Sequence, residues 1–392
     1  MSLIAWLDTS DEEERSMREL VALFSEPGTL DNLGIGQIRD GLADMLFPGI
    51  STVQTRARYL VLIPWTFQRA ARRNSGVALV KAADREQREI LLALREAGHT
   101  QGLIGRVAGA AVRVLPSAIY WNALQTYKIL RRETPPQHLL QTGRSTAGED
   151  DASHSSSWST LPLPESFPDN VAVQGFDLSV AEASWIRERM VLTCEGSLLA
   201  YLLSLPAMPD LDVDYLWELQ LGEAPQDLLD LVEDAELFSL ALLGASLLYN
   251  VMVGEAYERL ELTSVENPTQ WYRGELERWS AQYRNDARAL IWDRPRLWRR
   301  FPNISPRTRQ FVEDWIAGVD NLPVGACADT AELRKLISKR EFQNKGAQSR
   351  LTNEKQIRLW QGASGASRLQ FRWPQAARIL DDISEGLDNA GA

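Results

Sequence analysis

The chain has 392 residues, of which 44% are hydrophobic and 24% are charged. This composition is typical of a globular protein with room for two or three domains. The two cysteines, Cys194 and Cys327, show no pairing pattern, which excludes a disulfide framework and indicates a reducing compartment. The opening MSLIAWLDTSDEEE lacks the basic region and the long apolar run of a signal peptide, so we expect a cytoplasmic protein.

The net charge of −11 is divided unevenly along the chain. Residues 1–50 carry a net charge of −7 and residues 149–266 carry −20, whereas residues 51–148 carry +10 and residues 267–392 carry +6. Such blocks predict two basic surfaces separated by an acidic middle, and basic surfaces attract nucleic acid. The alternative is that the acidic and basic blocks pair with each other inside one fold.

Helical signals dominate the first 100 residues. Ser10 followed by Glu13 has the spacing of a capping box, and an apolar stripe at 3.6-residue spacing comes after it. Further helices are predicted at 35–45, 51–73 and 84–97, each bounded by glycine or proline. This pattern favours an all-α fold.

The segment around Pro116 has the strongest local pattern of the N-terminal half. Pro116 suits the first turn of a helix that we expect to include 117–132, after a glycine turn and a short helix at 101–107. This order fits a winged-helix or helix-turn-helix unit. The polar face of the long helix carries Trp121, Gln125, Lys128 and Arg132.

On that interpretation the polar face contacts the major groove of DNA, while Arg106 and Arg113 contact phosphates. The alternative is a helix on the domain surface whose basic face is merely solvated. Residues 142–170 are rich in serine, threonine, proline and acids, which is typical of a linker. We therefore expect an N-terminal helical domain at 1–141 and a C-terminal helical domain at 171–392.

The second half is organised around 237–254, a run of eighteen uncharged and mostly apolar residues. Its length approaches that of a membrane span. Its flanks are acidic instead of rich in lysine and arginine, and small polar residues interrupt it, so we expect a buried central helix and no membrane contact. Ahead of it, Ser179 and Glu182 form a second capping-box signature.

Tryptophans alternate with arginines beyond residue 268, and a basic amphipathic helix is expected from 331. Such a pattern can stack bases and bind phosphates. The residues that we assign to this nucleic-acid site are Arg296, Trp298, Arg299 and Arg300. The alternative is that the tryptophans belong to the core and the arginines pair with nearby acids.

No motif with assigned chemistry stands out. The three histidines, His99, His138 and His154, have no second ligand at metal spacing, and the acidic stretch 209–218 lacks the glycine and glutamate of a calcium loop. We therefore assign no catalytic residue, no metal and no cofactor. A nuclease site of carboxylates dispersed along the chain stays open as an alternative.

Several stretches of the sequence resemble an uncharacterised bacterial family of unknown function. They are the opening SLIAWLD, ILLALREAGHTQGLIGR with PSAIYWNAL, LLGASLLYN, and the closing LWQGASGASRLQFRW with ILDDI. The resemblance covers essentially the whole chain and implies a place in anti-phage defence clusters, beside helicases, methyltransferases or phospholipase-D-like nucleases. It transfers no catalytic residue.

These observations predict an all-α cytoplasmic protein of two helical parts joined by a Ser/Pro-rich linker. Its expected role is a non-enzymatic nucleic-acid-binding or adaptor subunit of an anti-phage defence system, with DNA and other defence proteins as partners. The alternatives are a pure protein–protein scaffold or a nuclease. The sequence distinguishes neither DNA from RNA nor one oligomeric state from another.

Overall fold

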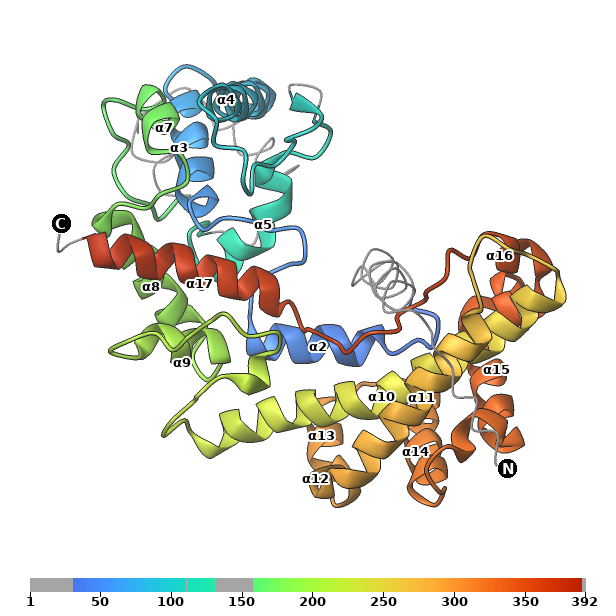
Figure 1. Cartoon of the computed structure of the whole chain (residues 1–392). Coiled ribbons are helices and arrows are strands. Elements are labelled where there is room, and N and C mark those ends of the chain that lie inside the picture. The colour runs from blue at the N-terminus through green and yellow to red at the C-terminus, as the bar shows by residue number, and fades with distance from the viewer. Residues whose placement is uncertain (1–30, 110–111, 132–157, 390–392) are drawn as a thin grey trace, which may run out of the picture. The chain divides into compact units, whose positions relative to one another are not determined.

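A computed structural model describes residues 31–109, 112–131 and 158–389 (Figure 1). Of these residues 64% are helical, mostly in fifteen α-helices and otherwise in short 3-10 helices, and the described chain contains no β-strand. A single isolated bridge joins Leu130 to Trp158. The predicted all-α fold is confirmed. The capping box expected at Ser10 and Glu13 lies outside the described residues.

The chain divides into two compact units, and each is built from segments that are distant in sequence. Within the described residues, unit 1 comprises 31–42 and 230–371, and unit 2 comprises 43–229 and 372–389. Each unit thus draws on both sides of the expected linker at 142–170. The expected division into domains at 1–141 and 171–392 stays a prediction.

Unit 2 contains the N-terminal helices and the last helix. Its α-helices are α3 (Tyr59–Ala71), α4 (Gly76–Glu96), α5 (Pro116–Thr126), α7 (Asp169–Gln174), α8 (Val180–Thr193), α9 (Leu198–Ser204) and α17 (Trp373–Asp388). The capping box at Ser179 is present: its hydroxyl accepts the Glu182 backbone N–H, and the Glu182 carboxylate accepts the Ser179 N–H at 2.8 Å. Helix α17 packs along α8 although they are far apart in the chain (Figure 1).

Helix α5 begins at Pro116 as predicted but ends earlier than expected. Lys128 has a left-handed backbone (φ 52°), and the Leu130 N–H donates to the Leu124 carbonyl at 2.8 Å, so the chain turns away from the helix axis. The helix therefore stops at Thr126 and does not continue through 117–132. Residues 101–107 form turns instead of the short helix that we expected. The winged-helix or helix-turn-helix interpretation stays a prediction.

Unit 1 is built around the long helix α10 (Gln226–Arg259), whose first four residues belong to unit 2. Helix α2 (Gly36–Leu46) is likewise shared, with residues 36–42 in unit 1 and residues 43–46 in unit 2. The remaining α-helices are α11 (Pro268–Asn285), α12 (Ala287–Leu290), α13 (Arg294–Arg300), α14 (Pro306–Asp320), α15 (Ala331–Lys345) and α16 (Glu354–Arg358).

Helix α10 is long and apolar enough to cross a membrane by length and composition, and 83% of its most apolar window is buried within the protein. Gly244 makes close packing against this helix possible, because the Trp279 ring occupies the space that a side chain at 244 would fill. The indole N–H groups of Trp279 and Trp315 donate to the α10 carbonyls of Leu240 and Ala241 at 2.7 and 2.8 Å. The central stretch is thus a buried helix, as expected.

Candidate nucleic-acid interface

Four tryptophans of the C-terminal Arg/Trp block lie in the core of unit 1, whereas Trp271 is half-buried. Trp279, Trp292, Trp298 and Trp315 are all buried. The indole N–H of Trp298 donates to the carboxylate of Glu313, and Arg309 lies over its ring at 5.4 Å. Stacking on a base would require a ring face open to solvent, and Trp298 does not offer one.

Arg296 and Arg300 converge on one fully buried carboxylate of α10. Asp234 accepts hydrogen bonds from Arg296 at 2.9 Å, from Arg300 at 3.1 Å and from the Trp292 indole at 3.0 Å. Arg296 also forms ion pairs with Glu233 and Asp230, at 2.6 and 3.2 Å. A buried charge needs such partners. These guanidinium groups therefore stabilise the buried Asp234 carboxylate and are not available to bind phosphates.

Most of the other arginines of the block also have acidic partners, while Arg284 donates to the Asp320 backbone carbonyl. Arg299 is exposed and lies 3.6 Å from Asp293. Further ion pairs join Arg273 to Glu255 and Asp329, Arg278 to Glu275, Arg288 to Glu236 and Asp286, and Arg294 to Glu313. Hydrogen bonds from Arg273 lower the pKa of the Asp329 carboxyl. The positive charge of the block is therefore largely balanced within unit 1.

The six site residues predicted in the N-terminal half differ in how exposed their side chains are. Trp121 is buried against Phe67 and Trp158, with ring centroids 6.2 and 6.1 Å away, so it cannot lie on the polar face that the sequence indicated. Gln125 is half-buried. The exposed members are Arg106, Arg113 and Lys128. Arg132 lies outside the described residues.

A different basic surface emerges on the hairpin of α3 and α4, which we call the hairpin surface. It consists of Arg72, Arg73, Lys81 and Arg85, all exposed. Among the residues that the structure describes, none of these four side chains forms a salt bridge. The nearby Arg69 lies 4.0 Å from Glu86 and is at least partly neutralised. Unpaired cations on a solvated surface are available to phosphate groups.

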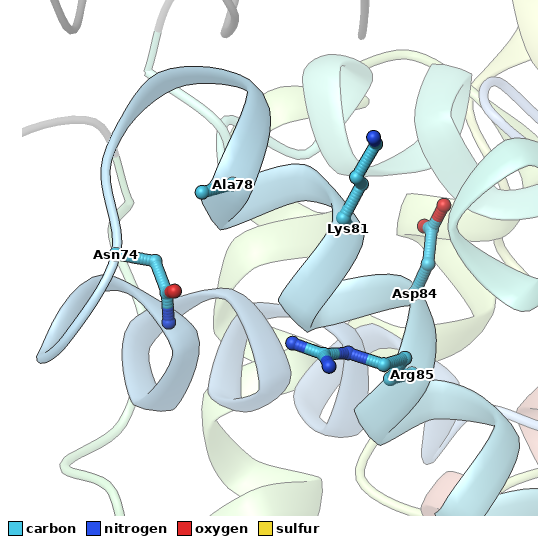
Figure 2. A pocket seen from close by; sticks show the side chains of 5 residues that line it. All are labelled: Asn74, Ala78, Lys81, Asp84 and Arg85. Carbon is cyan, nitrogen blue, oxygen red and sulfur yellow. The ribbon is translucent and has the colours of Figure 1, made fainter.

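A cleft of about 430 Å³ opens on this hairpin, lined by Asn74, Ala78, Lys81, Asp84 and Arg85. Figure 2 shows the Arg85 side chain reaching from α4 toward the turn that carries Asn74. The Lys81 amine and the Asp84 carboxylate project in another direction, side by side. The cleft therefore offers the Arg85 guanidinium and the Asn74 amide on one side, while Lys81 and the neighbouring Asp84 carboxylate project on another.

Two carboxylates, those of Asp84 and Glu86, reduce the positive electrostatic potential of the hairpin surface. Burial raises the pKa of Asp84, and the charge of Arg88 acts in the opposite direction. Burial likewise raises the pKa of Glu86, against the effects of Arg69 and Arg85. A raised carboxyl pKa reflects a penalty on the negative form, so the hairpin environment does not stabilise these anions strongly.

The sequence contained a signal for this surface that was not assigned to a site. The block 51–148 has a net charge of +10, and Arg72 and Arg73 lie at the C-terminal end of the predicted helix at 51–73. The local pattern could not show which arginines have acidic partners, because those partners come from other elements. The described residues also contain no group of three or more His, Cys, Asp or Glu arranged to hold a metal ion.

Comparisons with known proteins add a family but no activity. A model described as a family of unknown function, DUF6361, matches residues 1–387. No curated protein and no solved structure matches the chain.

Proposed function

The chain belongs to the DUF6361 family of unknown function, and from the distribution of its unpaired cations we propose that it is a nucleic-acid-binding adaptor subunit. The observation that carries this proposal is the contrast between two basic regions. In unit 1 the arginines of 273–300 other than Arg284 form ion pairs with acidic side chains, whereas Arg72, Arg73, Lys81 and Arg85 of unit 2 form no salt bridge within the described chain. Exposed Arg106, Arg113 and Lys128 extend the positive charge of unit 2.

Binding of this kind depends on phosphates and is weak for an acidic chain. Each phosphate contact releases counterions, so the affinity falls as salt rises, with a log–log slope of about −0.9 per contact on duplex DNA. The net charge of −11 opposes binding at distances within the Debye length of about 8 Å at physiological salt. We expect a Kd of about 1–100 μM for the isolated chain, in the range of non-specific binding.

The test neutralises the hairpin surface: Arg72→Gln, Arg73→Gln, Lys81→Gln and Arg85→Gln in one variant. Fluorescence anisotropy with single- and double-stranded DNA and RNA across a salt series should show lower affinity for this variant. If all four side chains contact duplex phosphates, the salt slope should decrease in magnitude by about 3–4. Circular dichroism should be unchanged because all four residues are exposed.

A matched control removes the same charge from unit 1, at the exposed residues Arg259, Arg307, Lys355 and Arg358. Its affinity should stay close to that of the wild-type chain. Substitution of Arg300 is a poorer test, because it also removes a partner of buried Asp234. If the wild-type chain binds no nucleic acid at low salt, the proposal fails and a protein–protein scaffold takes its place.

The adaptor part of the proposal follows the family resemblance, which implies cytoplasmic anti-phage defence beside a helicase, methyltransferase or nuclease. A subunit that binds nucleic acid weakly alone gains affinity when a partner binds the same molecule, because the second contact becomes intramolecular. Co-expression of the chain with proteins encoded beside it, followed by affinity purification, tests this part. Recovery of the chain alone in every combination would contradict it.

A further inference from the structure

Helix α15 presents a face to solvent that no described part of the chain covers. Lys335, Lys339 and Phe342 are all exposed and, at about 100° per residue, lie within an arc of about 60°. We call these three residues the α15 face. Glu332 lies at the edge of this arc.

The opposite side of the same helix is firmly held in unit 1. Leu333 and Ile337 are buried, and Arg340 donates to the Leu33 carbonyl and to the Thr308 hydroxyl. The fully buried Glu341 accepts hydrogen bonds from the Tyr249 hydroxyl at 2.7 Å and from the Arg350 backbone N–H at 2.8 Å. The α15 face is therefore a rigid surface whose side chains can change without loss of the core.

Charge and apolar character occur together on the α15 face. Neither Lys335 nor Lys339 forms an ion pair with a described residue. Phe342 is 55% exposed and is the one aromatic side chain among the exposed large apolar residues of the described chain. A partner that fits this face must bring carboxylates at the spacing of the lysines and some apolar surface for the ring.

The chain itself carries a segment with these properties in unit 2. Residues 207–229 include six acidic residues and no lysine or arginine. Asp210, Asp212 and Asp214 are exposed, while Leu211 and Val213 between them are half-buried, as expected for an extended chain with alternating side chains. The Asp212 backbone N–H donates to the Asp210 carboxylate at 3.0 Å, and the Val213 carbonyl accepts the Trp373 indole N–H at 2.9 Å, which fixes the segment locally.

The spacings of the two surfaces match. Side chains at i and i+2 of an extended chain lie about 6.5–7 Å apart, and those at i and i+4 of a helix lie about 6 Å apart. Two of the three aspartates can therefore meet Lys335 and Lys339 one to one. We propose that the α15 face of one chain docks residues 210–214 of a second copy of the chain.

Because this contact joins two different surfaces, two copies that form it reciprocally around a twofold axis make a closed dimer. Copies that form it head to tail make a ring if the rotation closes and a filament if it does not. The interface is small and charged, which favours weak association that strengthens at high local concentration, for instance when several copies bind one nucleic acid. The proposal does not depend on nucleic-acid binding, because its test needs the protein alone.

The experiment is sedimentation velocity of the full chain over a concentration series at low and at physiological salt. At low salt the average mass should rise above that of the 44.1 kDa monomer with concentration, and added salt should reverse the rise. Lys335→Glu with Lys339→Glu should lower the association constant by about tenfold or more, as should Asp212→Lys with Asp214→Lys. Phe342→Ser should weaken association without altering its salt dependence.

Mixing the two charge-reversal variants provides the decisive measurement. One then carries an acidic α15 face and the other a basic 210–214 segment, so complementary contacts form again and association should return in the mixture. The variant Lys355→Glu with Arg358→Glu, which makes the same charge change on α16, should associate like the wild type. The proposal is overturned by a wild-type chain that stays monomeric at low salt, by association insensitive to both reversals, or by failure of the mixture to associate.

Discussion

Arg56 and Asp382 are separated by 326 residues in the chain and form a buried ion pair in unit 2. The Arg56 Nε donates to Asp382 at 3.0 Å, a terminal guanidinium nitrogen lies 2.9 Å from the other carboxylate oxygen, and the Ala57 backbone N–H donates at 2.8 Å. Burial raises the pKa of Asp382, and Arg56 acts against that rise. The carboxylate therefore depends mainly on Arg56 to stay charged at low cost, with a smaller contribution from Arg378, whose Nε lies 3.4 Å away.

Replacement of Arg56 by methionine should destabilise the protein by about 3–5 kcal/mol at neutral pH, because Asp382 is left with much less compensation for its burial. The folded-state pKa of Asp382 should then rise further above the 3.8 of the unfolded chain. A raised carboxyl pKa means that the folded state binds the proton more tightly, so the penalty shrinks as the pH falls through the folded-state pKa toward 3.8.

Urea unfolding of the Arg56→Met variant and the wild type at neutral and mildly acidic pH measures this difference. The double variant Arg56→Met with Asp382→Leu is the control, since it removes both charges and should recover much of the lost free energy of unfolding. A loss of stability that is the same at both pH values would contradict this account of Asp382.

At the scale of elements, the contact of α10 with α11 depends on the absence of a side chain at Gly244. A Cβ placed there would lie 2.2 Å from the Trp279 ring, which is itself buried and bonded through its indole to the Leu240 carbonyl. Glycine in a helix interior costs about 0.5–1 kcal/mol relative to alanine. The packing of Trp279 outweighs that intrinsic cost.

Gly244→Ala should therefore destabilise the protein by about 1–3 kcal/mol, the usual cost of overpacking a core. Gly274→Ala on α11 is the matched control, because a Cβ there would meet nothing within 4 Å. It should stabilise the protein by about 0.5–1 kcal/mol through helix propensity alone. Thermal and urea unfolding measure the stability of both variants. If Gly244→Ala and Gly274→Ala changed the free energy of unfolding in the same direction, the packing argument would be refuted.

At the scale of the whole molecule, unit 2 is completed only by the last helix of the chain. In α17 the side chains of Ala376, Ile379, Leu380 and Ile383 are buried. At Gly386 the backbone approaches α8 so closely that a Cβ would lie 2.8 Å from that of Ala183. The segment 43–229 thus lacks part of its own core when it is separated from residues 372–389.

The fragment 43–229 should consequently fail to unfold cooperatively and should bind a hydrophobic dye such as ANS, because the surface that α17 covers is exposed. Addition of residues 372–392, supplied in trans on a soluble carrier, should restore a cooperative transition. Differential scanning calorimetry with ANS fluorescence makes the measurement. Wild-type-like unfolding of 43–229 alone would show that α17 is dispensable to unit 2.

Local signals in the sequence were sufficient for the helices. Pro116 at a first turn, Ser179 with Glu182, and the apolar run at 237–254 each specify structure through hydrogen bonds or burial patterns within a few residues. The end of α5 at Thr126 was not predictable in this way. It follows from the left-handed Lys128 and from the bridge between Leu130 and Trp158, two residues that are distant in sequence.

The sequence by itself determined the all-α class, the buried central helix and the blocks of charge. Only the tertiary structure decided which charges are free to act. The sequence pattern predicted a nucleic-acid site at Arg296 and Trp298. In the structure, Asp234 of α10 accepts a hydrogen bond from Arg296, and Glu313 of α14 accepts one from Trp298. The physical reason is that helix formation depends on neighbours in the chain, whereas the partner and the burial of an ionised group depend on which distant elements meet it.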